Sequence, residues 1–262
     1  LRCFCDNVLI PKIEKKLIND NVACRKGKGT KYGMDRLKYF LQKEYFKNND
    51  NKVYYLKCDI RKYFPSINHN ILINNLKRID FTGDEFWFIK KIINEQPDNL
   101  ERGLALGNQS SQWFALYYLD KIDRLIKEEL QIKSYVRYMD DFILLHRDKK
   151  YLQYCLEKIN KVCIEKLDLE LNQKTQIGLA YNGIDFLGFN HILTNSGKVI
   201  RKLRFSSKQR MRKHIKIIRK LKDKSVIDEE YVGMRINAFK AHLKHSNEKS
   251  MDKLLSNLDK KI

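Results

Sequence analysis

Three aspartates in this sequence stand beside strongly apolar runs. Asp59 ends the β-branched and aromatic stretch VYYLKCD, and Asp140 and Asp141 are adjacent at the centre of YVRYMDDFILLH. Carboxylates are costly to bury without a partner, and three at one sheet edge would repel one another and call for cations. Hard oxygen ligands suit Mg²⁺, and paired Mg²⁺ ions are the usual apparatus of in-line phosphoryl transfer. The three aspartates are therefore candidate ligands of metal ions that act on a phosphate-bearing substrate.

Each acidic site also has a purely structural interpretation. Aspartate is common in turns, so Asp140 and Asp141 alone fit a polar turn between two strands. Asp59 alone fits a cap for the segment that follows it. Because neither site decides the matter by itself, the surrounding sequence has to.

The elements around these aspartates predict an α+β fold. The segment 53–59 is predicted as a strand, and 132–146 as an antiparallel hairpin whose turn holds the acidic pair. Strands and helices interleave, which favours a palm-like antiparallel sheet with helices on one face and a helical C-terminal module. Further predicted strands are 169–171, 174–179, 184–189 and 199–205; predicted helices are 10–18, 34–45, 68–77 capped by Asn68, 84–94 capped by Asp84, a long helix capped by Ser110 or Ser111, 152–163, and the basic segment from Ser207 onward.

The charge balance indicates a polyanionic partner. The 262 residues include 53 Lys and Arg against 32 Asp and Glu, a net charge of +21, and the excess is densest between Lys198 and Lys224. Aromatic residues make up 11% of the chain, and stacking side chains often accompany patches that bind nucleic acid. A basic but unspecialised surface is the alternative. Charge and aromatic content together favour nucleic acid.

The cysteines and the apolar runs bear on the compartment. Six cysteines occur without a C-x-x-C pair, which suits a reducing cytoplasm better than a disulfide framework or a zinc site. No apolar run reaches membrane-spanning length and no signal peptide is visible, so we expect no membrane partner. Because the first residue is Leu1 rather than Met, we expect the sequence to be a fragment or a processed chain.

The segments around the aspartates resemble the motifs of reverse transcriptases. YMDD at 138–141 matches the family's Y-x-D-D turn, and DIRKYFPSI at 59–67 is similar to its first catalytic strand. These segments and the others stand in family order over nearly the whole chain. The others are CRKGKGT at 24–30 (fingers base), RGLALGNQSSQ at 102–112 (nucleotide binding), LNQKTQI at 171–177 (a lysine near the triphosphate), GIDFLGF at 183–189 (primer grip) and AFKAHLKHSN at 238–247 (thumb).

The resemblance implies a right-hand polymerase architecture with an antiparallel palm sheet, partial helical fingers and a C-terminal helical thumb. In relatives, basic residues for the triphosphate lie on an N-terminal fingers hairpin. Only residues before about Leu9 remain of that hairpin, so either it is absent or the sequence is truncated. The implied domains are 1–50 (partial fingers), 51–67 (palm, first catalytic strand), 68–103 (fingers helices), 104–205 (palm with YMDD hairpin and primer grip) and 206–262 (basic thumb).

Two-metal nucleotidyl transfer is the chemistry that this resemblance implies. Asp59, Asp140 and Asp141, helped by the backbone carbonyl of Ile60, would bind two Mg²⁺ ions, with Mn²⁺ as a substitute. One ion would lower the pKa of the primer 3′-OH, and the other would neutralise the triphosphate and the pyrophosphate. The implied partners are a template RNA, a DNA or RNA primer, the cDNA product and deoxynucleoside triphosphates.

Five residues are implied in nucleotide binding. Phe64 matches the family's aromatic gate against a 2′-OH, and core packing is its alternative role. Lys174 would pair with the leaving group, unless it is simply a solvated lysine. Gly107 lets the chain approach the nucleotide closely, unless it is only a turn glycine. Leu106 and Gln112 stand where most relatives have Gln and Pro.

Primer and template contacts are implied along the basic segments. Met139 would lie under the primer end, unless it is a turn residue with no such role. Arg25, Lys26 and Lys28 would contact template phosphates, or they form a solvated loop. The grip and thumb residues assigned to the primer and template are Gly188, Arg204, Lys208 and Arg212.

The departures at Leu106 and Gln112 resemble the enzymes of diversity-generating retroelements. Those bacterial, archaeal or phage-encoded enzymes copy a template RNA with errors at adenines, and they use a small basic accessory protein. A glutamine can hydrogen-bond near the nascent base pair and an aliphatic side chain cannot, so fidelity is expected to fall. The alternatives are a group II intron-like or defence-associated reverse transcriptase, and a non-catalytic RNA-binding protein on the same scaffold.

Overall fold

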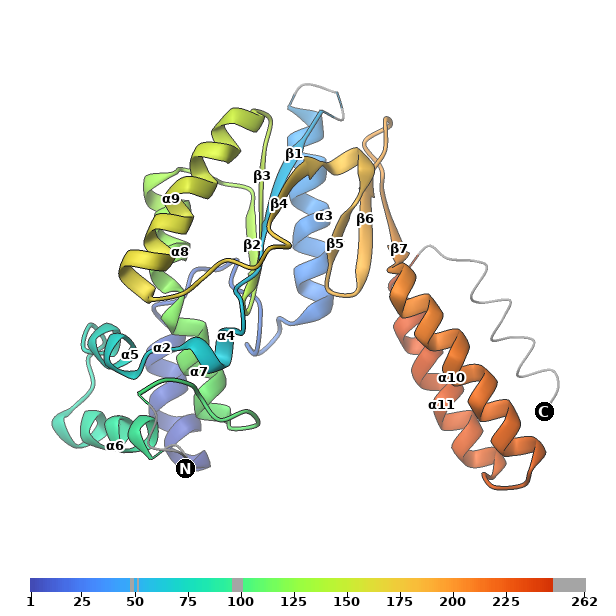
Figure 1. Ribbon diagram of the computed structural model, residues 1–262, viewed down its shortest axis with the longest axis horizontal. Coiled ribbons are helices and arrows are strands. Elements are labelled where there is room, and N and C mark those ends of the chain that lie inside the picture. Colours follow the sequence, from blue (N-terminus) through green and yellow to red (C-terminus); the bar gives the residue numbers. More distant parts are fainter. Residues whose placement is uncertain (48–49, 51, 96–100, 247–262) are drawn as a thin grey trace. The chain divides into compact units, whose positions relative to one another are not determined.

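The computed structural model describes residues 1–47, 50, 52–95 and 101–246 (Figure 1). Two compact units make up the chain, and each is described here by itself. The first contains Leu1–Glu44 and Val53–Leu179, and the second contains Tyr45–Lys52 and Ala180–Ile262. The end of the predicted thumb, 247–262, lies outside the described residues. The division at 179/180 falls inside the predicted palm segment 104–205, and the domain limits themselves stay a prediction.

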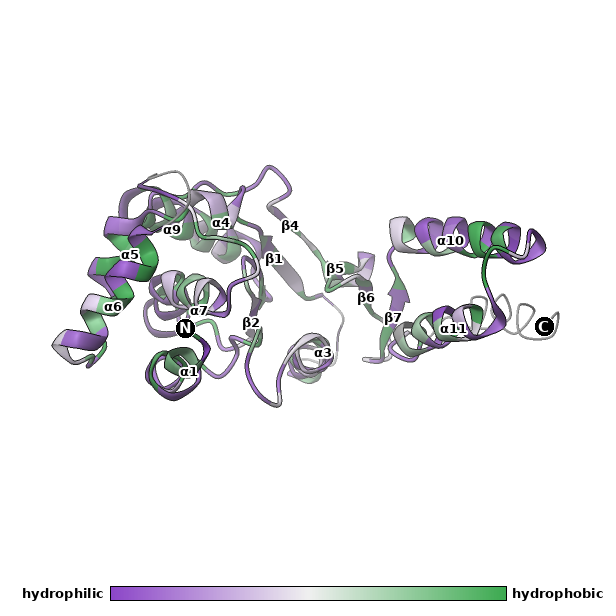
Figure 2. Ribbon diagram, turned by 90° about the horizontal axis from the view of Figure 1, so that it is seen from below, coloured by the Kyte–Doolittle hydropathy of each residue, from purple (hydrophilic) through white to green (hydrophobic). Residues whose placement is uncertain are grey.

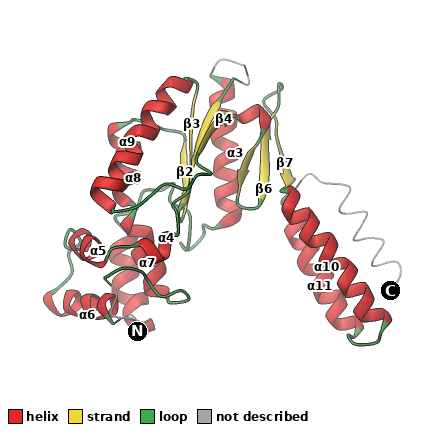
Figure 3. Ribbon diagram, in the orientation of Figure 1, coloured by secondary structure: helices red, strands yellow, loops and turns green. Residues whose placement is uncertain are grey.

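A four-stranded antiparallel sheet forms the centre of the first unit (Figure 3). Its strand order is β2-β3-β1-β4, so the predicted hairpin lies at one side and the predicted strand 53–59 lies inside. Both predictions are confirmed. The strands are β1 (Tyr54–Cys58), β2 (Tyr135–Tyr138), β3 (Asp141–His146) and β4 (Gln176–Leu179).

One face of this sheet packs into the main hydrophobic core. Helix α9 (Lys149–Leu167) lies there, capped by Asp148, whose side chain accepts a hydrogen bond from the amide of Lys150. The helix buries Leu152 and Cys155 among others, as the spacing predicted, and a fully buried aliphatic side chain stabilises by roughly 1.5–3 kcal/mol. The sheet residues of this core include Leu56, Cys58, Tyr135, Phe142 and Leu144.

The other face of the sheet is covered as well. Helix α3 (Thr30–Phe46) lies on the side opposite α9 (Figures 1 and 2) and buries Met34, Leu37 and Leu41. The prediction of helices on one face only is therefore wrong. Tyr55 and Leu56 show the reason, because neighbouring residues of β1 point to opposite faces and both are buried. The predicted helix 34–45 itself is confirmed.

Two helix caps differ from the prediction. Asn68 caps α5 (His69–Leu76) as predicted, but α6 (Gly83–Asn94) is capped by Thr82, which exchanges hydrogen bonds with Glu85 in a capping box. That box satisfies two free amides at once, so it outcompetes Asp84. Helix α7 (Gln109–Tyr118) begins after Asn108 rather than at Ser110 or Ser111. It ends at Tyr118, so it is shorter than the long helix that was predicted. The remaining helices of this unit are α1 (Arg2–Phe4), η1 (Cys5–Leu9), α2 (Ile10–Glu14), α4 (Tyr63–Ser66), α5 (His69–Leu76), α6 (Gly83–Asn94), α7 (Gln109–Tyr118), α8 (Asp120–Arg124) and η2 (Leu125–Glu129).

The second unit pairs a three-stranded antiparallel sheet with a helical hairpin. The segment predicted as one strand, 184–189, contains a two-residue turn at Leu187 and Gly188. The strand after this turn, β6 (Phe189–Leu193), was not predicted. The other predicted strand, 169–171, is only a single bridge at Leu171 in the first unit. Among described residues, no helix is both long and apolar enough to cross a membrane. The elements are η3 (Ala180–Asn182), β5 (Ile184–Phe186), β6 (Phe189–Leu193), β7 (Val199–Leu203), α10 (Phe205–Asp223) and α11 (Glu229–Leu243).

Candidate active site

A tight turn that contains the acidic pair joins β2 to β3. Tyr138 pairs with Asp141 across the hairpin and Met139 and Asp140 lie between them, and we call residues 138–141 the YMDD turn. Met139 has a φ of 55°, in the left-handed region that costs a residue with a side chain roughly 1–2 kcal/mol. A positive φ at this position matches the twist of a tight hairpin. The turn is therefore strained, and contacts around it must hold its shape.

The third aspartate lies beside this turn. Continuing the β1–β3 register by one step places Asp59 opposite Asp141. Burial raises the pKa of Asp141 from 3.8 to about 6, although the ammonium of Lys57 lowers it. The charges of Asp59 and Asp140 raise it further. Burial also raises the pKa of Asp140, and Asp59 adds to that effect. Three carboxylates thus repel one another where β1 ends and β3 begins.

Lys57 is a partner of this site that the sequence did not suggest. Its Nζ lies 3.2 Å from Oδ2 of Asp141, and its side chain is 13% exposed. The other oxygen of that carboxylate, Oδ1, is buried without a hydrogen-bond partner among the described residues. A lysine within the apolar stretch VYYLKCD, two residues before Asp59 and so on the same strand face, was the available signal.

The donor set fits a hard divalent cation in its chemistry. In the described part of the chain, no three His, Cys, Asp or Glu side chains already surround a common metal position. The observation that fits a metal is the buried Oδ1 of Asp141, which has no partner, next to carboxylates that repel it. Ile60, the predicted carbonyl donor, is 2% exposed and forms a bridge with Leu171. Asp59, Asp140 and Asp141 are thus the residues that would draw together on a cation.

The segments predicted to bind the nucleotide are bonded to the Asp59 region. The amide of Leu104 donates to the carbonyl of Phe64 at 3.1 Å, and the hydroxyl of Tyr63 donates to the carbonyl of Ala115 in α7 at 2.5 Å. These bonds attach the segment 102–112 to the strand-end motif. Phe64 also packs against the main core, which confirms its alternative role and leaves the gate a prediction.

Leu106 and Gln112, the two positions that differ from most relatives, have different surroundings. Leu106 is 77% exposed, whereas Gln112 lies on α7 and is half-buried. Gly107 has a φ of 93° and open space where a Cβ would lie, so the need for glycine here is conformational. The turn interpretation of Gly107 is confirmed, and its approach to a nucleotide stays a prediction.

Lys174 is exposed in the turn before β4. Its amide donates to Oδ1 of Asn172, whose own amide donates to the carbonyl of Asp59 at 2.7 Å. Lys174 therefore lies two residues after Asn172, which is bonded to the backbone of Asp59. This placement suits both a solvated lysine and a lysine that meets a leaving group.

The fingers-base loop uses its cations unequally. The side chain of Arg25 is 10% exposed, and its guanidinium donates to Glu14 at 3.1 Å and to the carbonyls of Ile18 and Asn21. The solvated-loop interpretation is therefore wrong for Arg25, whose contacts are with the segment 14–21 that precedes the loop. Lys28 donates to the carbonyl of Asn19 at 2.6 Å, and burial lowers its pKa. Lys26 is exposed.

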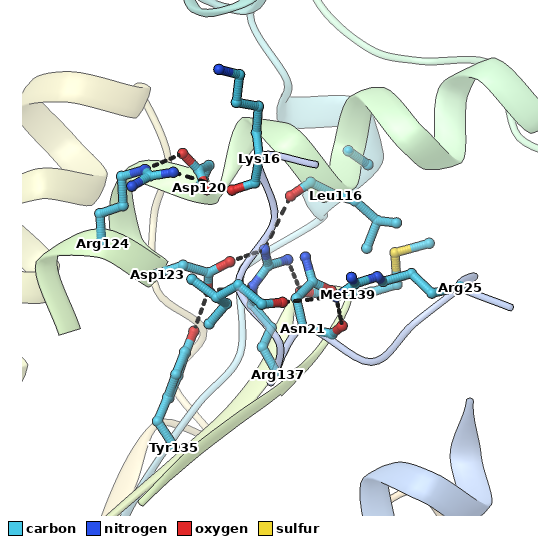
Figure 4. Close-up of polar contacts among 12 residues, drawn as sticks. Lys16, Asn21, Arg25, Leu116, Asp120, Asp123, Arg124, Tyr135, Arg137 and Met139 are labelled. Atoms are coloured by element: carbon cyan, nitrogen blue, oxygen red, sulfur yellow. Dashed lines mark hydrogen bonds and ion pairs between the residues drawn. The ribbon is translucent and has the colours of Figure 1, made fainter. Parts of the chain in front are cut away.

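A buried ion pair lies behind the YMDD turn (Figure 4). Arg137 and Asp123 are both fully buried, with Nε to Oδ1 at 2.8 Å and Nη2 to Oδ2 at 2.5 Å. Burial alone lowers the pKa of the Arg137 guanidinium, but Asp123 together with Tyr135 and Tyr63 raises it above its usual value, so the arginine stays charged. The hydroxyl of Tyr135 also donates to Asp123 at 2.6 Å. We did not predict this pair, although an arginine inside the apolar stretch YVRY was a signal.

The grip and thumb residues lie in the second unit. Gly188, with a φ of 86°, is the second residue of the β5–β6 turn, and its carbonyl accepts from the amide of Arg204 at 3.2 Å. Nε of Arg204 lies 3.5 Å from Asp185. Lys208 is half-buried on α10 and Arg212 is exposed. The Lys and Arg residues of this helix are Lys208, Arg210, Arg212, Lys213, Lys216, Arg219, Lys220 and Lys222.

Solved structures with a similar fold include telomerases. The telomerase from Candida albicans in complex with a TWJ fragment of telomeric RNA matches with a TM-score of 0.58 and 14% identity, over 77% of this chain and 39% of that one. Apo telomerase from Candida tropicalis, truncated from its C-terminal domain, matches with a TM-score of 0.58 and 17% identity, over 76% and 47%. This chain spans under half of each, and at these identities the likeness shows the fold alone.

Sequence comparison identifies the family. A comparison with curated proteins finds no match. The family described as reverse transcriptase (RNA-dependent DNA polymerase) matches residues 5–191, a stretch that includes all three aspartates and the YMDD turn. This match covers more than half of the chain, and the polymerase fold of the similar structures agrees with it. The chain therefore belongs to the reverse transcriptase family.

Proposed function

We propose that this chain is an RNA-directed DNA polymerase that makes cDNA on an RNA template. The observation that carries the proposal is that Asp59, Asp140 and Asp141 lie near one another at the ends of neighbouring strands, with one buried carboxylate oxygen lacking a partner among the described residues. An RNA-binding module would have no need for three carboxylates that repel one another, whereas a polymerase needs such carboxylates to bind cations. The family match and the basic helix α10 support the same conclusion.

In the proposed mechanism the chain supplies ligands and alignment. Asp59, Asp140 and Asp141 would hold two divalent cations, which when bound activate the primer 3′-OH and neutralise the triphosphate. The YMDD turn and its buried strands hold the backbone of Asp140 and Asp141 at the end of one hairpin, so mainly the acidic side chains would have to move when cations bind. Phe64 would limit the space at the sugar of the incoming nucleotide, and Lys174 would pair with the departing pyrophosphate.

The proposed partners follow from charge. Template RNA, a DNA or RNA primer and deoxynucleoside triphosphates are polyanions, and a net charge of +21 favours them. We assign the duplex to α10 and to Gly188 and Arg204, and we assign template phosphates to Lys26 and Lys28. We place the enzyme in a bacterial, archaeal or phage-infected cytoplasm, where the described cysteines would remain free thiols.

Primer extension on an RNA template with Mg²⁺ tests the activity. We expect incorporation by the native chain and a loss of about 10³-fold or more for D140N combined with D141N, because a metal clamp supplies several kcal/mol. The control is RNA binding at several salt concentrations, which the double variant should retain. Equal incorporation by both proteins would overturn the proposal, and salt-sensitive RNA binding without incorporation would establish the non-catalytic alternative.

For the subtype, we propose the error-prone enzyme of a diversity-generating retroelement. Leu106 and Gln112 support it, since an exposed aliphatic side chain at 106 cannot hydrogen-bond to a nascent base pair. The test is the error spectrum of L106Q, which should misincorporate less opposite adenine than the native chain. Sequencing of cDNA made on a template with equal base content measures this. An unchanged spectrum would favour a group II intron-like or defence-associated enzyme.

A further inference from the structure

The guanidinium of Arg137 bonds to three groups, on α8, in the YMDD turn and on α7, and the backbone of the same residue bonds to the segment 20–22. It is paired with Asp123 of α8, and Nη1 donates to the carbonyl of Met139 in the YMDD turn at 2.9 Å. Nη2 also donates to the carbonyl of Leu116 in α7 at 3.0 Å. The backbone of the same residue exchanges hydrogen bonds with residues 20 and 22, at 3.0 and 2.9 Å. Figure 4 shows the guanidinium between these groups.

Each of these acceptors needs a donor. Met139 is the strained residue of the turn, and a bond to its carbonyl restrains the peptide that leads into Asp140. Leu116 lies in the last turn of α7, where carbonyl groups lack partners within the helix. A cation at a helix C-terminus is also favoured by the helix dipole. Arg137 therefore satisfies one carbonyl in the turn and one in α7 with a single planar group.

The two acceptors belong to the two halves of the proposed site. The turn carries Asp140 and Asp141, and α7 carries Gln112 four residues before Leu116. Only arginine has a fork with enough donors in one plane to bind a carboxylate and two carbonyls at once. A lysine would keep the charge opposite Asp123 but could not span all three acceptors.

We propose that Arg137 is a positioning residue for nucleotidyl transfer, which holds the YMDD turn and helix α7 in one fixed arrangement. Asp123 in turn orients Arg137 and keeps it charged in the interior. This inference rests on the proposed polymerase function, but the geometry that it describes exists without substrate. It predicts that loss of the fork matters more for the chemical step than loss of the charge pair.

Two conservative variants separate positioning from stability. R137K keeps the positive charge and loses the bond to Met139. D123N keeps the shape of the side chain that faces Arg137 and loses the negative charge. Single-turnover incorporation, normalised to active sites, is expected to slow 10–100-fold for R137K, since misplacement of about 1 Å costs up to 10² in rate. For D123N we expect a change within about threefold at the active-site level, despite a larger loss of thermal stability.

A second measurement does not depend on activity. Hydrogen exchange of the 138–142 amides in the metal-free proteins should speed up at least about tenfold in R137K and remain near the native rate in D123N. Rates and exchange that follow stability in both variants would overturn the inference, as would an R137K rate within twofold of native. If the native chain makes no cDNA, the polymerase proposal fails and the exchange result alone decides whether Arg137 fixes the turn.

Discussion

The chain contains two tight hairpin turns that face the same backbone problem and solve it differently. The YMDD turn places Met139 at a φ of 55°, and the β5–β6 turn places Leu187 at 50°. In the second turn the next residue is Gly188, which tolerates its φ of 86° at little cost. In the first turn no glycine is present, and a buried guanidinium bonds to the carbonyl of Met139 instead.

The two turns differ in the side chains that support them. The β5–β6 turn has a glycine at its second position, and the ion pair near it, between Arg204 and Asp185, is half-exposed. The YMDD turn must present two acidic side chains, and its two central residues are Met139 and Asp140, neither of which is a glycine. Its support has to come from the core, through Arg137 and Asp123.

The largest expected effect is on stability, from removing the acid of each ion pair. D123A should lower the free energy of unfolding by about 3–5 kcal/mol, because it leaves a buried arginine without its counter-charge. The matched variant D185A should cost less than about 1 kcal/mol, since that pair is solvent-screened. Urea unfolding followed by circular dichroism measures both. Similar losses would show that the two turns do not differ in this way.

A smaller effect is expected from the glycine of the second turn. G188A should lower the free energy of unfolding by about 1–2 kcal/mol, because alanine is strained at this φ while its Cβ meets open space. The control is G233A in helix α11, where the Cβ also meets open space and alanine should stabilise by about 0.5–1 kcal/mol. The same substitution thus has opposite signs at two sites of one unit. Equal signs would contradict the role given to the turn.

The smallest expected effect concerns pH and the first turn. Asp141, with a pKa of about 6, must lose its proton before it can bind a cation, so affinity should fall as pH falls through 6 and level off above it. Between pH 7.5 and pH 5 we expect about a tenfold loss, or about 1.4 kcal/mol. Mn²⁺ titration followed by electron paramagnetic resonance measures this. D141N is the control and should lack the step at pH 6, whereas a native affinity that is flat over this range would contradict the assignment.

Some of this structure was predictable from the sequence for local reasons. The strand that ends at Asp59 and the hairpin around Asp140 are apolar runs bounded by polar residues, and they also match family motifs. The cap of α6 was assigned wrongly because Thr82 and Asp84 are both good caps, and only the reciprocal bond with Glu85 decides between them. The β5–β6 turn was missed because Leu187 gives no sign of a positive φ.

The supports of the site were not predictable in the same way. The pairing of Arg137 with Asp123 joins a strand to a helix, and nothing in either local sequence says which buried charge meets which. The same holds for Lys57 and Asp141, which are neighbours only because β1 lies beside β3. Motifs identify the groups that touch substrate, whereas the groups that hold them are defined by tertiary contacts alone.

The bond between Lys57 and Asp141 has a practical consequence for handling the protein. Many metal-dependent domains unfold when a chelator removes the ion, because the ion is part of the fold. Here the ammonium of Lys57 already lies beside the carboxylate of Asp141. Chelation should therefore leave a folded apo protein, in which metal binding can be titrated as an event separate from folding.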